Sequence, residues 1–77
     1  MKNLSRLPVL SADQVVKALK RAGFKIVRQS GSHIHLWNEK DRVLVTVPNH
    51  NELAKGTLNA VIKQAKMNRE DFLELVK

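Results

Sequence analysis

The sequence predicts a small α+β domain in which helices cover one face of a three-stranded antiparallel sheet. Two segments, 12–22 and 58–65, repeat apolar residues at the spacing of an amphipathic helix. Between them, residues 33–37 and 42–47 alternate apolar and polar positions, which is the period of a half-buried strand. Helix and strand patterns that follow one another along the chain in this way favour two packed layers.

The first helix is expected to begin after Ser11. Ser11 and Gln14 form a capping-box pattern, in which each side chain accepts a hydrogen bond from the other residue's backbone N–H. Gly23 is the expected C-terminal stop. One face of this helix carries the apolar stripe Ala12, Val15, Val16, Leu19 and Ala22. The outer face is a basic ridge of Lys17, Lys20 and Arg21.

Three strands are expected over residues 24–29, 33–37 and 42–47. The first turn is Ser30, Gly31 and Ser32, and the second is the polar segment 38–41. Pro48 ends the third strand, because it cannot donate a hydrogen bond to a sheet ladder.

The register of the second hairpin follows from the need for one apolar face. Pairing Trp37 with Arg42 meets this need, whereas a shift by one residue would bury the histidines. The core face then carries Ile34, Leu36, Val43, Val45 and Val47. The open face carries His33 opposite Thr46, His35 opposite Leu44, and Trp37 opposite Arg42.

Two further helices are expected after the sheet. Thr57 is the predicted cap of the second, which buries Leu58, Val61, Ile62 and Ala65. Asn68 is the predicted cap of a short third helix, which buries Phe72, Leu75 and Val76. The order helix, three strands, two helices, with helices on one face of the sheet, is the arrangement of double-stranded-RNA-binding domains.

Composition limits the class of protein. With 77 residues and 43% hydrophobic positions, we expect a single domain over residues 1–77, including an extended N-terminal segment over residues 1–10. The chain has no cysteine, which excludes disulfides and thiolate metal sites and fits the reducing cytoplasm. No apolar run approaches the ~18 residues of a membrane span, so no membrane partner is expected.

The charge of the chain is one-sided. Its net charge is +7, and between Asp13 and Glu39 there are five basic residues and no acid. Such a field favours a polyanionic partner, usually RNA or DNA. The alternative is a solvated basic face that aids solubility.

The stretch around His33 is the main candidate for chemistry. Gly31 lets the backbone approach a phosphate closely, and the Ser32 hydroxyl can donate a hydrogen bond to it. The His33 imidazole, on the open face, could take the proton of a ribose 2′-hydroxyl or protonate a leaving oxygen. The alternative is a surface histidine after a turn, and spacing alone favours that reading.

Other side chains have two readings each. His33 and His35 share a face, as zinc-binding strand histidines can, but no third ligand is evident and no metal is expected. Trp37 could stack on an unpaired base, although a cation–π pair with Arg42 is favoured. His50 could be a second acid or base, but the sequence favours a role in stabilising its loop.

Several basic residues are candidates for binding phosphate, and the alternative for each is an ordinary surface side chain. Lys55 is expected just before the second helix, whose N-terminus also attracts anions. The predicted substrate-binding residues are Gly31, Ser32, Lys55, Arg28, Lys20 and Lys63.

Four stretches carry a resemblance to a known family: "LPVLSADQVVKALKRAGFKIVRQSGSHIHL", "VTVPNH", "ELAKGTLNAVIKQA" and "REDFLELV". In this order, and over nearly the whole length, they resemble the HicA-type mRNA interferase toxins of the HicA/HicB toxin–antitoxin family. The resemblance implies a fold like that of double-stranded-RNA-binding domains and an endoribonuclease that cleaves mRNA without metal or cofactor. It also implies neutralisation by a HicB-type antitoxin, with DNA contacted only indirectly through the antitoxin complex.

The resemblance also assigns residues. The family's single catalytic histidine follows the Gly-Ser turn and here is His33, while Gly31 and Ser32 match the turn itself. His50 matches the histidine two residues after the "VP" pair, and Lys55, Gly56 and Thr57 match the start of the second helix.

Two positions depart from the family pattern. The turn over residues 38–41 lacks the glycine often seen there. Lys66 stands where a glycine often stops the second helix, so Lys66 adopts a positive φ or the helix ends differently.

Two other functions remain open. One is a non-catalytic RNA-binding module of the same fold, which the sparse lysines of the second helix count against. The other is a protein-interaction domain that uses the open face of the sheet.

Overall fold

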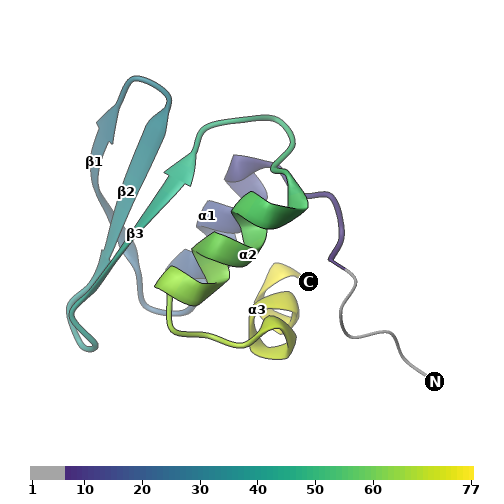
Figure 1. Ribbon diagram of the computed structural model, residues 1–77. Coiled ribbons are helices and arrows are strands. Elements are labelled where there is room, and N and C mark those ends of the chain that lie inside the picture. The colour runs from purple at the N-terminus through teal and green to yellow at the C-terminus, as the bar shows by residue number, and fades with distance from the viewer. Residues whose placement is uncertain (1–6) are drawn as a thin grey trace.

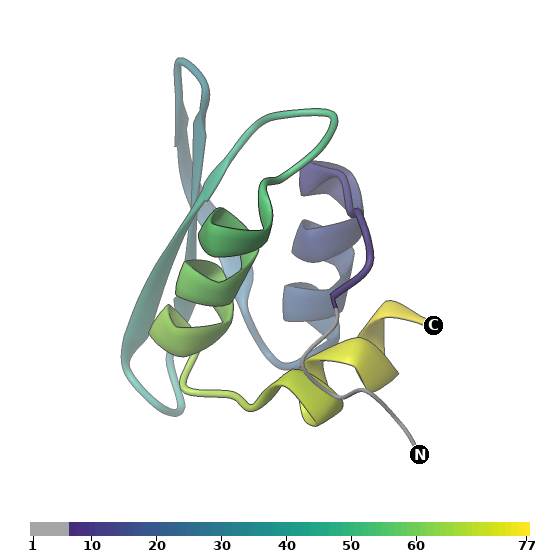
Figure 2. The ribbon, with the colours of Figure 1, turned by 45° about the vertical axis from the view of Figure 1, so that its right-hand side comes forward.

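The computed structural model describes residues 7–77 and has the predicted order of elements, which confirms the α+β class. Residues 1–6 of the predicted N-terminal segment lie outside the described residues, and residues 7–10 have no regular secondary structure. The elements are α1 (Ala12–Arg21), β1 (Lys25–Ser30), β2 (His33–Asn38), β3 (Val43–Pro48), α2 (Lys55–Gln64) and α3 (Arg69–Val76). The strands form one antiparallel sheet in the order β1-β2-β3, and the helices lie on one side of it (Figures 1 and 2).

Helix α1 begins and ends as predicted. Ser11 Oγ accepts from the Gln14 N–H at 3.2 Å, and Gln14 Oε1 accepts from the Ser11 N–H at 2.9 Å, which completes the capping box. Gly23 follows the helix with φ +100°, a conformation that glycine adopts without a steric penalty. In the last turn, one Arg21 guanidinium nitrogen donates to the carbonyls of Leu75 and Lys77, so α1 holds the end of α3.

The register predicted for the second hairpin is wrong by two residues. Trp37 lies opposite Leu44 and not Arg42, His35 lies opposite Thr46, and His33 lies opposite Pro48. The five predicted core residues still face the helices, because a shift of two residues keeps every side chain on its face.

The predicted and observed registers differ because of Asn38. This residue is the last of β2 and pairs with Val43, whereas the prediction placed it in the turn. Its side chain is 4% exposed and makes two hydrogen bonds. Nδ2 donates to the Ala22 carbonyl at the end of α1, and Oδ1 accepts from the Asp41 N–H. The turn therefore covers residues 39–42, and Arg42 adopts φ +55° in place of the missing glycine.

Strand β1 is an edge strand that projects beyond the helices (Figure 2). All six of its residues are exposed, and a register shift between Ile26 and Arg28 marks a bulge. Bulges and charged side chains at an edge discourage pairing with other strands. The turn to β2 is Gly31-Ser32, with φ +56° at Gly31, as expected for a two-residue turn with glycine first.

The predicted cap of α2 is also wrong. Helix α2 begins at Lys55, with Ala54 as an N-cap that makes no side-chain hydrogen bond, so Thr57 is the third helical residue. Lys66 has φ +61°, which confirms the first of the two expected outcomes at this position. Asn68 caps α3 as predicted, because its Oδ1 accepts from the Asp71 N–H at 2.7 Å.

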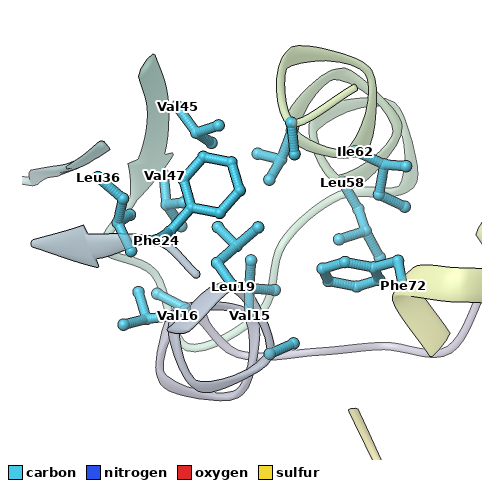
Figure 3. Packing of buried hydrophobic residues seen from close by; sticks show 14 of the residues in the cluster. Val15, Val16, Leu19, Phe24, Leu36, Val45, Val47, Leu58, Ile62 and Phe72 are labelled. Carbon is cyan, nitrogen blue, oxygen red and sulfur yellow. The ribbon is translucent and has the colours of Figure 1, made fainter. Parts of the chain in front are cut away.

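The core lies between the sheet and the helices (Figure 3). Phe24 points toward Val45 and Val47 of β3, and Phe72 of α3 lies beside Leu58 of α2. Phe72 is fully buried, whereas Leu75 and Val76, also predicted inside, are partly buried. Within residues 7–77, no helix has the length and apolar character that crossing a membrane requires.

Candidate functional site

The candidate site is at the end of the sheet where β1 turns into β2. The Ser32 carbonyl accepts a hydrogen bond from the Asn49 N–H at 2.6 Å, which ties this turn to the loop after β3. The next residue, His50, accepts from the Ala12 N–H through its carbonyl at 2.9 Å. The turn, the loop and the start of α1 therefore meet at one end of the molecule, the top of Figure 1.

His33 is the first residue of β2 and lies on the sheet face that points away from the helices. Its side chain is exposed, and its cross-strand neighbours are Ser30 of β1 and Pro48 of β3. The predicted neighbour, Thr46, lies two residues before Pro48 on β3, opposite His35. The open-face position of His33 was predictable, because side chains alternate along a strand.

The other two histidines have different surroundings. His35 is half-buried, and its Nδ1 lies 3.0 Å from Thr46 Oγ1, so one nitrogen of this ring is engaged by the neighbouring strand. His50 is exposed, and its backbone makes the hydrogen bonds that fix the loop. The imidazoles of His33 and His50 are thus the two exposed ones, and both lie at the same end of the sheet.

The predicted phosphate-binding residues do not all lie at the same end of the molecule. Lys55 is the first residue of α2, directly after the loop that follows β3 (Figure 1). Arg28 lies opposite His35 on the open face. Lys20 and Lys63 lie in the last turns of α1 and α2, about 12 Å further along these helices, so they are not brought to His33.

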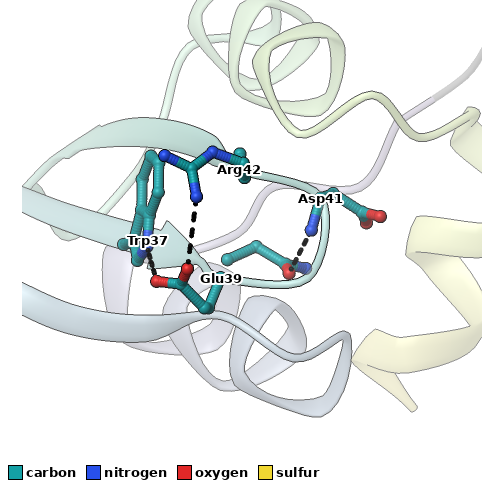
Figure 4. A network of polar contacts seen from close by, with 5 residues as sticks. Trp37, Glu39, Asp41 and Arg42 are labelled. Carbon is teal, nitrogen blue, oxygen red and sulfur yellow. Dashed lines mark hydrogen bonds and ion pairs between the residues drawn. The ribbon is translucent and has the colours of Figure 1, made fainter.

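Two residues near Trp37 were not singled out from the sequence. Lys25 lies directly opposite Trp37, a pairing that the bulge in β1 made unpredictable. Glu39 joins Trp37 to Arg42: its Oε1 accepts from the indole Nε1 at 2.8 Å, and its Oε2 pairs with the guanidinium at 3.5 Å (Figure 4). The predicted pair of Trp37 and Arg42 is therefore bridged by a carboxylate.

No group of three or more His, Asp or Glu side chains in residues 7–77 is arranged to hold a metal ion. The chemistry that the site can offer with its own side chains is proton transfer by exposed imidazoles and anion binding by lysine, arginine and backbone N–H groups.

Comparison with known proteins identifies the family of this chain. The model of one family, described as HicA toxin of bacterial toxin–antitoxin, matches residues 12–67, from the start of α1 to just past α2. Helix α3 lies outside the match. A comparison with individual curated proteins finds no relative. Because the match covers well over half of the 77 residues, the chain belongs to the HicA toxin family of bacterial toxin–antitoxin systems.

Proposed function

We propose that this HicA-family toxin is an endoribonuclease that cleaves mRNA, and so inhibits translation, with His33 as its catalytic residue. The observation that supports this most is the placement of His33. It is exposed, directly follows a Gly-Ser turn, and lies on the sheet face that the helices leave bare. A substrate can therefore reach its imidazole without rearrangement of the core.

The proposed reaction uses the RNA's own 2′-hydroxyl. His33 takes the proton of this hydroxyl, and the 2′-oxygen bonds to the adjacent phosphorus. The bond from phosphorus to the 5′-oxygen of the next nucleotide breaks, and that oxygen takes up a proton. The products are a 2′,3′-cyclic phosphate and a 5′-hydroxyl. His50, the other exposed imidazole at this end, is the candidate for donating the second proton.

The turn and the start of α2 are proposed to hold the phosphate. Gly31 has a positive φ and no side chain, and Ser32 is an exposed residue that carries a hydroxyl. Lys55 is the first residue of α2, whose N-terminal N–H groups receive no side-chain cap. Free N–H groups at a helix N-terminus and a lysine both stabilise negative charge, which increases on phosphorus during the reaction.

Cleavage should not need a metal ion. The expected result is that the purified protein degrades RNA at the same rate with and without excess chelator, because proton transfer by imidazole needs no ion. Gel analysis of a defined RNA measures this. Cleavage that stops with chelator and returns with a divalent ion would contradict the mechanism, and duplex or single-strand binding without any cleavage would favour the non-catalytic RNA-binding module.

A HicB-type antitoxin is the proposed protein partner, docking on or beside the His33 face and the basic ridge of α1. Residues 14–38 carry five positive charges and no negative ones, so an acidic partner would be attracted over a distance. We expect the association rate with the cognate antitoxin to fall steeply with added salt, which stopped-flow mixing measures. A salt-insensitive rate, or a footprint confined to residues 66–77, would exclude this docking mode.

A further inference from the structure

The open face of the sheet is organised in three cross-strand rows that run away from His33. The observed register places three residues in each row, one from each strand. The rows are Ser30-His33-Pro48, then Arg28-His35-Thr46, then Lys25-Trp37-Leu44. The first row contains the proposed catalytic histidine, and the third lies about 13 Å away, four residues along β2.

The third row combines an aromatic ring with exposed apolar surface. Leu44 is 53% exposed and lies beside Trp37. The indole is held in place by the 2.8 Å hydrogen bond from its Nε1 to Glu39. A ring that is already fixed loses little conformational entropy when a planar ligand stacks on it.

Three positive charges flank this apolar surface. Lys25 and Arg28 come from β1, and Arg42 comes from the turn beyond Trp37. The acid beside them, Glu39, is engaged by both Trp37 and Arg42. Aromatic surface flanked by cations matches a single-stranded nucleic acid, which presents the planes of its bases and a row of phosphates.

We propose that this face binds the single-stranded RNA next to the cleaved bond, with a base stacked on Trp37 and Leu44 and its phosphates paired with Lys25 and Arg28. This inference rests on the proposed function, because it extends the substrate path from His33 along β2. It also sets the substrate class: in duplex RNA the base planes are occupied by their neighbours, so only an unpaired base can stack on the indole. A protein partner on the same face is the competing occupant.

Trp37 is the only tryptophan in the chain, so its fluorescence reports on this face alone. The experiment uses the His33→Ala protein to prevent cleavage and titrates it with a single-stranded RNA and with a duplex of the same sequence. We expect the single strand to quench Trp37 fluorescence and the duplex to bind more weakly without comparable quenching.

Variants then test the contacts by fluorescence anisotropy with labelled RNA. Trp37→Ala should weaken binding of the single strand by about 5- to 150-fold, the range for losing one stacked base, while Trp37→Phe should retain most of the affinity. Lys25→Ala should also weaken binding. Lys77→Ala, which removes an exposed lysine paired with Glu74 at the end of α3, is the matched charge control and should have a smaller effect.

Three results would overturn the inference. The first is unchanged RNA affinity in Trp37→Ala with a normal melting curve. The second is tighter binding of the duplex than of the single strand. The third is that Trp37→Ala loses affinity for the antitoxin alone. The last result would mean that the open face of the sheet binds the protein partner and not RNA. Each result is separable from failure of the proposed function, because cleavage by the unmodified protein is measured independently of binding by the His33→Ala protein.

Discussion

His33→Ala should lower the rate of RNA cleavage by about 10²–10⁴-fold, the usual loss when a general acid or base is removed. The protein should still fold, because the ring is exposed and lies opposite Ser30 and Pro48, outside the core. A surface truncation of this kind usually changes the free energy of unfolding by less than about 0.5 kcal/mol. The measurements are the cleavage rate on a defined RNA and the thermal melting temperature.

Two matched variants make this result interpretable. His35→Ala removes a second imidazole from the same face, but this ring contacts Thr46 and not the Gly-Ser turn, so the loss of rate should be smaller. His50→Ala removes the proposed proton donor and should also lower the rate of cleavage. Normal cleavage by His33→Ala would refute the assignment, and loss of cleavage through unfolding would instead refute its placement outside the core.

Phe72→Ala should destabilise the protein by about 3–5 kcal/mol, the range for truncating a buried phenylalanine. Phe72 is fully buried, is the buried residue of α3 and lies beside Leu58 (Figure 3). The cavity left behind would loosen α3 from the rest of the core, although the contacts of Arg21 with the Leu75 and Lys77 carbonyls would remain. Urea unfolding, followed by circular dichroism, measures the change.

Leu73→Ala is the matched control, because the neighbouring side chain is only partly buried and its truncation should cost clearly less. A loss below about 1 kcal/mol for Phe72→Ala would mean that α3 does not pack as described. Helix α3 lies outside the residues matched by the family model. The two variants therefore measure how much α3 contributes to the stability of this chain.

Patterning predicted the order of elements and the buried faces, because helical and strand periods differ and one face must be apolar. The register of the second hairpin was not predictable in the same way. Two alignments that differ by two residues bury the same side chains, and the choice between them depends on Asn38. Its hydrogen bond to the Ala22 carbonyl joins residues 16 positions apart, and no local pattern reveals it.

The start of α2 was predicted incorrectly for a similar reason. A threonine before an apolar stripe is a usual cap, but the helix begins three residues earlier than predicted, at Lys55, with Ala54 as the N-cap in extended conformation. The positive φ of Lys66, by contrast, is one of the two outcomes expected from the family pattern.

The position of His33 on the open face was predictable, because side chains alternate along a strand. The error in register did not affect it, since a shift of two residues keeps each side chain on its face. Its cross-strand neighbours were not predictable, since Pro48 replaces Thr46. The role of Glu39 in holding Trp37 was missed because a surface glutamate in a turn carries no distinguishing pattern. Lys25 was missed because the bulge in β1 changes which residues share the face of Trp37.

The most direct test of the account is to analyse the ends of the RNA products in excess chelator, with the unmodified protein and with His33→Ala side by side. Attack by the 2′-hydroxyl under the action of His33 predicts a 2′,3′-cyclic phosphate and a 5′-hydroxyl from the unmodified protein, and almost no product from the variant. Products that carry a 5′-phosphate, or equal amounts of product from both proteins, would contradict it.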